Sequence, residues 1–174
     1  GRTAAIDRPM RRLYHLAIGQ ARRTITITSA YFVPDRALRR ALRRAVERGV
    51  RVRLLLPAVS DVAPVLYASQ RHFDRLLRRG VEIYRYEPSI LHAKTAVIDG
   101  EWSTIGSANM DSLSFNWNLE ANFVVEDRET GRELEDRFEV DLRHSERVDL
   151  AEWRRRPWWH RVIEWGASIL GPVL

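Results

Sequence analysis

The 174 residues carry a net charge of +6, with 45% hydrophobic and 30% charged residues, a composition typical of one globular domain with a sizeable core. The absence of cysteine excludes disulfides and thiolate metal sites, and no apolar run reaches the ~20 residues that a membrane-spanning helix needs. The positive charge favours anionic partners such as phospholipid headgroups, nucleic acid or phosphate esters, although a genomic bias toward arginine explains it equally well.

The first half of the chain alternates between helical and strand patterns. Residues 8–22 have apolar residues at intervals of four with arginines between them, which predicts a helix. Residues 24–29 alternate β-branched and hydroxyl side chains and predict a strand. Asp35 is a predicted N-cap for a helix over residues 36–48, and a second strand follows over residues 51–56.

The second half begins with a predicted helix and continues with a run of strands. The helix covers residues 62–79, and a last, charged amphipathic helix covers residues 129–145. The strands between them are predicted over residues 81–86, 91–98, 102–105 and 118–125. This order indicates an α/β fold, namely a three-layer α/β/α sandwich with a mixed central sheet.

Residues 151–174 differ in composition from residues 1–150, which we expect to form a single catalytic domain. Four of the six tryptophans lie within thirteen residues of this segment, and three consecutive arginines lie among them. Tryptophan beside arginine suits the headgroup level of a bilayer, so we expect a membrane-interface element. The alternative is that these aromatic residues pack on the domain or on a partner domain.

The strand predicted over residues 91–98 contains His92 and Lys94, which alternation places on the same face. Lys94 is the only lysine among 29 basic residues, either by chance or because the position needs a compact ammonium group. An imidazole can act as nucleophile or general acid near neutral pH, and an ammonium group stabilises charge on phosphoryl oxygens. The pair therefore indicates phosphate chemistry.

Six residues of this region have a fixed order and spacing: His92, Lys94, Asp99, Gly106, Ser107 and Asn109. The pattern resembles the HKD motif of the phospholipase D superfamily. Glu120 follows His92 by 28 residues, where that family carries the carboxylate that orients its histidine. Residues 29–35, 109–115 and 153–159 are also similar to the C-terminal half of a bacterial cardiolipin synthase.

The resemblance implies a two-step displacement at phosphorus through a phosphohistidine, with no metal and no cofactor. Such synthases carry two HKD motifs, and this sequence has one. We expect His15, His72, His144 and His160 to be surface or packing residues. The second catalytic histidine must then come from another HKD domain of the parent chain or from a homodimer. By resemblance, the histidine of the C-terminal motif is more often the general acid and base than the nucleophile.

The resemblance also implies roles for the other motif residues. Lys94, Ser107 and Asn109 would hold phosphoryl oxygens. Glu120 would accept the imidazole N–H of His92.

Two motif residues are expected to be structural. Gly106 belongs to the motif, and Asp99 would bond the local backbone at its turn with Gly100. Weaker candidates for the wall of the cleft are Tyr31, Asp61 and Ser114.

The favoured function is a cardiolipin-synthase-type phosphatidyltransferase that acts on an anionic, phosphatidylglycerol-like phospholipid at the bacterial cell membrane. The protein would be peripheral or anchored by an upstream region. Two alternatives remain open: a phosphodiesterase, phospholipase D or nuclease that acts as a homodimer, and a non-catalytic membrane-binding half. The tryptophan- and arginine-rich tail argues against nucleic acid as the partner.

Overall fold

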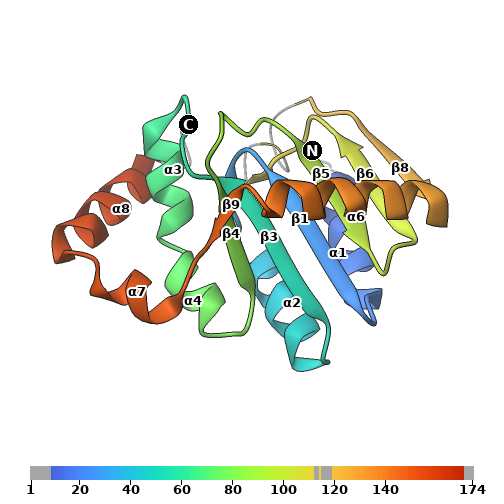
Figure 1. The fold of residues 1–174 in the computed structure, drawn as a ribbon, viewed down its shortest axis with the longest axis horizontal. Helices are drawn as coiled ribbons and strands as arrows, with labels where there is room; N and C mark the ends of the chain where they lie inside the picture. The colour runs from blue at the N-terminus through green and yellow to red at the C-terminus, as the bar shows by residue number, and fades with distance from the viewer. Residues whose placement is uncertain (1–8, 112–113, 115–118, 171–174) are drawn as a thin grey trace, which may run out of the picture.

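The computed structural model describes residues 9–111, 114 and 119–170, and Figure 1 shows their helices on both sides of a central sheet. The sheet has seven strands: β1 (Thr24–Ser29), β3 (Arg51–Pro57), β4 (Glu82–Tyr86), β5 (Lys94–Ile98), β6 (Trp102–Gly106), β8 (Asn122–Glu126) and β9 (Ser145–Arg147). Their order is β8-β6-β5-β1-β3-β4-β9, with β1, β3 and β4 mutually parallel and the other pairings antiparallel. The mixed sheet predicted from the sequence is therefore confirmed.

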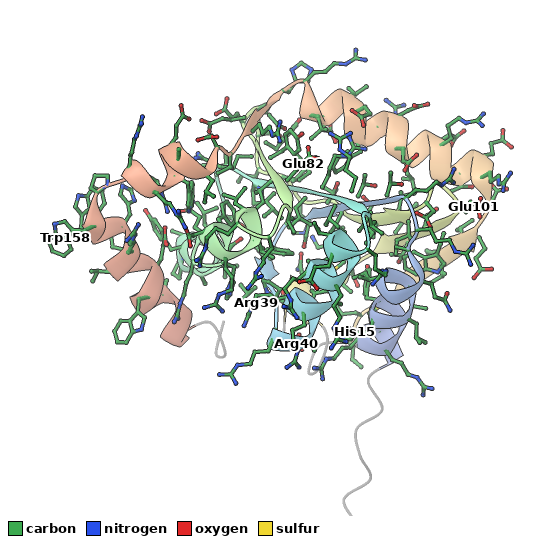
Figure 2. All side chains as sticks on the ribbon, turned by 90° about the horizontal axis from the view of Figure 1, so that it is seen from below. His15, Arg39, Arg40, Glu82, Glu101 and Trp158 are labelled. Atoms are coloured by element: carbon green, nitrogen blue, oxygen red, sulfur yellow. The ribbon has the colours of Figure 1, made fainter. Side chains whose placement is uncertain are left out.

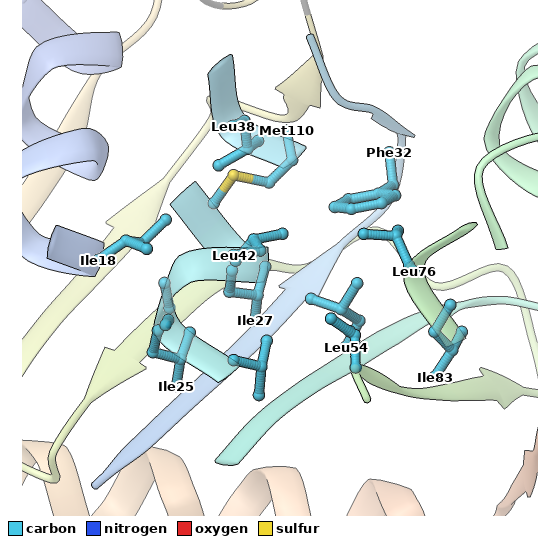
Figure 3. Packing of buried hydrophobic residues seen from close by; sticks show 14 of the residues in the cluster. Ile18, Ile25, Ile27, Phe32, Leu38, Leu42, Leu54, Leu76, Ile83 and Met110 are labelled. Atoms are coloured by element: carbon cyan, nitrogen blue, oxygen red, sulfur yellow. The ribbon is translucent and has the colours of Figure 1, made fainter. Parts of the chain in front are cut away.

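Helices cover both faces of this sheet. Helices α1 (Pro9–Gln20) and α2 (Arg36–Glu47) lie on one face, and α6 (Arg128–Leu142) crosses the other (Figure 1). Neighbouring residues of β3 point to opposite faces, so Leu54 packs with Leu42 of α2 while Leu55 packs with Phe138 of α6. Figure 3 shows the larger core, on the α2 side of the sheet. The predicted three-layer sandwich is confirmed.

The start of α2 follows the N-cap signal read in the sequence, and a glycine follows its last turn. The Asp35 carboxylate accepts a hydrogen bond from the backbone N–H of Leu38 at 2.7 Å, which caps the helix. Gly49 lies just after the helix with a φ of 88°, a backbone conformation that favours glycine.

The single helix expected over residues 62–79 is wrong, because the chain forms two helices there. These are α3 (Ala63–Gln70) and α4 (Phe73–Leu77), separated by a turn at residues 71 and 72. The turn directs Phe73 into the core, where its ring lies 4.9 Å from that of Trp153. A distant tryptophan thus favours the break, and local periodicity does not reveal it.

Other predicted boundaries moved by a few residues, and one strand pairing was not foreseen. The strand predicted over residues 91–98 begins only at Lys94, and the one predicted over 118–125 begins at Asn122, with residue 118 outside the described residues. The last amphipathic helix ends at Leu142, and the chain then forms β9 beside β4. Strands β2 (Phe32–Val33) and β7 (Met110–Asp111) form a separate parallel pair.

The C-terminal segment folds back on the domain as two helices. In α7 (Leu150–Arg155), Trp153 is buried, whereas α8 (Trp158–Leu170) lies against α3 (Figure 1). The tryptophans of α8 remain exposed, at 75% for Trp158 and 58% for Trp165. Within the described residues, no helix has the length and apolar character needed to cross a membrane.

Candidate active site

The HKD-like residues other than Asp99 gather where β1 ends and β5 begins. Ser29, the last residue of β1, lies opposite Lys94 in the antiparallel register. The Lys94 side chain is only 8% exposed, and its ammonium group donates a hydrogen bond to the carbonyl oxygen of His92 at 3.0 Å. The lysine is thus fixed against the backbone of the residue whose side chain it is predicted to assist.

His92 lies in the segment before β5, so the expectation that it shares a strand face with Lys94 is wrong. Its side chain is exposed and meets Tyr31 edge to face, with 6.4 Å between the ring centroids. The loop therefore presents the imidazole to the surface, while the strand buries the lysine. An exposed imidazole is accessible to a substrate and to a second domain.

Acidic side chains surround the lysine. Burial lowers the pKa of Lys94 below its ordinary value, and the nearby negative charges of Glu120, Asp61 and Asp111 oppose part of this shift, which favours the charged ammonium group. The sequence indicated Glu120 and Asp61 separately, but it gave no reason to single out Asp111. This residue was visible only as part of the block 109–115 that resembles the synthases.

Asn109 lies just before β7 and is held beside Tyr31, which lies just before β2, by the short β2–β7 pairing. Its side-chain oxygen accepts a hydrogen bond from the backbone N–H of Tyr31 at 3.1 Å, and its side chain is 8% exposed. The hydroxyl group of Ser29 donates to the carbonyl oxygen of Tyr31 at 2.7 Å and accepts from the N–H of Met110 at 3.1 Å. With its oxygen engaged in this way, the carboxamide has its N–H groups to offer to a phosphoryl oxygen.

Ser107 and Glu120 are joined directly. The Ser107 hydroxyl donates to the Glu120 carboxylate and accepts from the N–H of Ala121 at 3.0 Å, while the N–H of Ser107 donates to the carbonyl oxygen of Ala121 at 3.0 Å. Glu120 is therefore positioned through the end of β6. The expected hydrogen bond from His92 to Glu120 stays a prediction.

Gly106 is needed at this point because the β8 segment passes very close to it. A Cβ atom at position 106 would lie 2.3 Å from the carbonyl oxygen of Ala121 and 2.3 Å from the side-chain oxygen of Asn122. Both distances are far below van der Waals contact, so only glycine allows the segment that carries Glu120 to approach β6.

The three weaker candidates lie close to the same site. The hydroxyl group of Tyr31 donates to the Asp61 carboxylate at 2.9 Å, and this bond is the main cause that lowers the pKa of Asp61. The charge of His92 lowers it further, which places Asp61 near the imidazole. Ser114 is buried, and its N–H donates to the Asp111 carboxylate at 2.7 Å.

Asp99 lies at the far end of β5 and holds a different part of the chain from the one expected. Its carboxylate accepts hydrogen bonds from the backbone N–H groups of Arg22, Arg23 and Thr24 at 2.7–2.9 Å. Burial raises the pKa of Asp99, but these donors and the charge of Arg23 outweigh it, and the pKa is lowered. The residue fixes the start of β1, whereas the expectation was a bond within its own turn.

The other histidines lie on different elements. His15 is on α1, His72 lies in the turn between α3 and α4, His144 follows α6 and His160 is on α8. Burial, together with the charges of Arg39, Arg71 and Arg75, lowers the pKa of His72 to about 3. None of the four has a ring contact, hydrogen bond or ion pair with a motif residue in the described part of the chain.

Comparison with known proteins places these residues in a family context. Residues 14–142 match a family model described as "Cardiolipin synthase, PLD-like domain". The chain is 40% identical to cardiolipin synthase of Geobacillus thermodenitrificans and 38% identical to cardiolipin synthase 2 of Bacillus anthracis. Each alignment covers 95% of this chain but only 33% and 32% of the relative, so the chain spans about a third of the length of the curated relatives it matches.

Solved structures share the fold at low sequence identity. The phospholipase D family member Nuc from Salmonella typhimurium superposes with a TM-score of 0.69 at 18% identity, over 79% of this chain and 90% of that one. Phosphatidylserine synthase from Haemophilus influenzae superposes with a TM-score of 0.76 at 11% identity, over 94% and 42% of the two chains.

Proposed function

The chain belongs to the cardiolipin synthase family of phospholipase D-like domains, and we propose that it supplies one of the two half-sites of a phosphatidyltransferase. The observation that carries the proposal is the buried Lys94, fixed to the carbonyl oxygen of His92 among three acidic side chains. Such a compact, positioned ammonium group suits the equatorial oxygens of a phosphodiester as they gain charge. The carboxamide N–H groups of Asn109 would add donors to the site, whereas the Ser107 hydroxyl, which donates to Glu120, would position that carboxylate.

The reaction exchanges one alcohol for another at phosphorus. A histidine nitrogen attacks the phosphodiester and forms a P–N bond, while the P–O bond to the leaving alcohol breaks and a second histidine donates a proton to that oxygen. The second histidine then takes the proton of the incoming alcohol, whose oxygen attacks phosphorus and displaces the first histidine. By resemblance, the histidine of a C-terminal motif is more often the acid and base, and this is the role we propose for His92.

The proposed donor is a phosphatidylglycerol-like phospholipid, and the acceptor is a lipid alcohol. The second histidine would come from a second copy of the domain or from another motif-bearing half. The exposed position of His92 supports this arrangement, because an imidazole at the surface can face a partner across a shared substrate.

The exposed face of α8 would lie at the membrane interface, which modifies the expectation for the whole segment 151–174. Trp158, Val162 and Trp165 recur at a spacing of three to four residues and are 75%, 53% and 58% exposed. Trp153, in contrast, is buried and holds the segment on the domain. Replacing Trp158 and Trp165 by serine should weaken sedimentation with phosphatidylglycerol vesicles and leave the unfolding midpoint unchanged, whereas equal sedimentation would refute the assignment.

The proposed chemistry is tested by measuring oligomeric state and product together. Light scattering gives the mass, and thin-layer chromatography of phosphatidylglycerol vesicles gives the products, with His92→Ala as the control. A dimer that makes cardiolipin and loses this activity in His92→Ala means that two copies build the site. If the chain is an inactive monomer, the parent and His92→Ala are compared in the longer polypeptide. Transfer activity that survives His92→Ala there contradicts the proposal.

A homodimeric phosphodiesterase is the second candidate, favoured by the 90% coverage of the Salmonella chain. A family member can thus consist of little more than one such domain. This reading predicts hydrolysis of a soluble diester such as bis(p-nitrophenyl) phosphate without lipid transfer. Formation of phosphatidic acid and glycerol in place of cardiolipin would support it.

A further inference from the structure

A groove lined by arginines lies between α2 and α4, outside the candidate active site. It has a volume of about 710 Å³, and its lining consists of four arginines from α2, three from α4 and the turn after it, and Leu76. Figure 2 labels Arg39 and Arg40 on the side of the molecule away from α6. Arg36, Arg40 and Arg43 follow one another at helical spacing, so they form a basic stripe about 10 Å long.

Most of this positive charge is not neutralised by the residues that the structure describes. Arg43 pairs with Glu47 at 3.5 Å and Arg78 pairs with Asp74 at 3.1 Å. Within residues 9–111, 114 and 119–170, no ion pair is found for the exposed Arg36, Arg40, Arg75 and Arg79. Like charges that face one another across a groove destabilise the fold, and an anion between them would relieve this repulsion.

The groups beneath the groove respond to the same field. Burial lowers the pKa of Arg39, and the charges of Arg75, Arg36 and Arg71 lower it further against the opposing effect of Asp35. Burial also keeps His72 neutral at physiological pH, again with help from nearby arginines. The groove therefore concentrates positive charge above the partly buried side chains of Arg39 and His72.

The high arginine content of the chain does not explain this concentration. Helix α2 has five arginines and one glutamate, whereas α6 on the opposite face of the sheet has three arginines and six acidic residues. A uniform bias toward arginine would enrich both helices alike. The domain is instead electrically polar, with its basic side on the α2 face.

We propose that the groove binds the headgroup phosphates of anionic phospholipids and holds the α2 face against an anionic bilayer. Guanidinium groups bind phosphate oxygens through two parallel hydrogen bonds, so several arginines can engage neighbouring headgroups. The proposal extends the lipid role proposed for α8 to a second surface.

Two features favour a bilayer over a nucleic acid. Among the residues that the structure describes, no aromatic side chain lines the groove, so these residues offer no platform for stacking bases. The basic surface also continues toward α8, because Asp74 pairs with Arg78 of the groove and, at 2.6 Å, with Arg154 of α7. Beyond this link lies a hollow of about 530 Å³, whose lining includes four arginines, two tryptophans and the two acidic residues Asp74 and Glu164.

The test compares two triple variants with the same net charge. One replaces Arg40, Arg75 and Arg79 of the groove by glutamine, and the other replaces the exposed Arg132, Arg137 and Arg143 of the α6 region by glutamine. Sedimentation is measured with vesicles of phosphatidylglycerol and phosphatidylcholine in equal parts and with vesicles of phosphatidylcholine alone. Binding to a fluorescent duplex DNA is measured in parallel. Circular dichroism confirms that both variants are folded.

We expect the groove variant to bind the mixed vesicles about 30- to 150-fold more weakly, since each basic residue near an anionic surface strengthens binding about fivefold. The α6 variant should change by less than threefold, and binding to pure phosphatidylcholine should be the same for all proteins. Equal weakening of both variants, or no weakening of the groove variant, overturns the proposal. Loss of DNA binding alone overturns it in favour of nucleic acid. The measurement does not involve His92, so this inference and the proposed transfer chemistry fail separately.

Discussion

Strand β5 begins with Lys94 and is followed directly by Asp99, and the two charged side chains have different surroundings. Among the described residues, the ammonium group of Lys94 makes one hydrogen bond, to the backbone of His92, and the charges of nearby carboxylates act on it. The carboxylate of Asp99 accepts three backbone N–H groups from the start of β1. The first group keeps donor capacity for a ligand, whereas the second uses most of its acceptor capacity to hold the start of β1.

The separation of these residues along the strand explains the difference. Five residues of extended chain span about 17 Å, so Asp99 cannot reach a phosphate held by Lys94. One sequence motif thus combines residues for chemistry with residues that fix the strand carrying them. This comparison predicts that substitutions at the two ends of β5 separate activity from stability.

The largest effect is expected for Lys94→Arg, which keeps the charge but widens the head group. Transfer activity of the active assembly should fall at least about 100-fold, because the planar guanidinium cannot occupy the place of the compact ammonium group. Some loss of stability, about 1–3 kcal/mol, accompanies the larger side chain in a buried site.

The matched control is Arg53→Lys, the reverse exchange at a buried cation that pairs with Glu139 on the α6 side of the sheet. It should lower the unfolding midpoint and leave activity within threefold. If the Lys94→Arg variant retained activity within threefold of the parent, position 94 would need only a positive charge.

The next largest effect is expected for Asp99→Ala. Loss of three hydrogen bonds to a carboxylate should lower the free energy of unfolding by about 3 kcal/mol, measured by urea denaturation. Activity at a temperature where the variant remains folded should stay within threefold of the parent. Asp127→Ala is the control, because the Asp127 carboxylate accepts a hydrogen bond from the backbone N–H of Thr130 at 2.8 Å as an exposed helix cap, and its loss should lower the free energy of unfolding less than Asp99→Ala does.

Gly106→Ala tests the close approach that positions Glu120. The added Cβ must displace the backbone of residues 121 and 122, which we expect to cost about 2 kcal/mol in the free energy of unfolding. Gly166→Ala is the matched control, since nothing lies within 4 Å of a Cβ atom at that helical position. The control should be neutral or slightly stabilising, and an equal effect of both substitutions would mean that space at Gly106 is not limiting.

Much of the fold could be predicted from the sequence because its signals are local. β1 has the predicted bounds, and α2 begins after its predicted cap Asp35. The errors arise where distant contacts decide the structure. Trp153 buries Phe73 at the break between α3 and α4, and the hydroxyl group of Ser29 bonds the N–H of Met110 beside the unforeseen β2–β7 pairing.

The candidate site shows the same limit. Motif spacing predicted which residues to examine, and the structure brings Lys94, Asn109 and Ser107 to one region. Alternation within a strand could not place His92, because β5 starts two residues after it. Nor could spacing reveal the bonds of Asp99, whose partners lie more than seventy residues earlier in the chain.

A smaller, pH-dependent effect is expected for Asp99→Asn. The pKa of Asp99 is lowered in the folded protein, so its ionised form stabilises the fold above the ordinary value of 3.8. This contribution is lost as pH falls through the lowered folded pKa. The carboxamide of the variant has no charge to lose, so the gap in unfolding free energy between parent and variant, about 1–2 kcal/mol at pH 7, should shrink steadily below pH 4. A gap that is constant from pH 7 to pH 2 would contradict the assignment.

The smallest effect is expected for Tyr31→Phe, which removes one hydroxyl group next to the lysine end of β5. Because the Tyr31 hydroxyl donates to Asp61, its loss should raise the pKa of Asp61 toward the ordinary value, as measured by NMR titration of the carboxyl carbon. Stability should change by less than about 0.5 kcal/mol, since the bond lies at the surface.

Tyr84→Phe provides the comparison on a structural pair. The hydroxyl group of Tyr84 donates to Glu82 at 2.8 Å, but Arg51 is the main cause that lowers the pKa of Glu82. The pKa of Glu82 should therefore rise less than that of Asp61, because the arginine still holds the carboxylate in its ionised form. If the pKa of Asp61 rises no more than that of Glu82, the hydrogen bond from Tyr31 is not the main cause that lowers the pKa of Asp61.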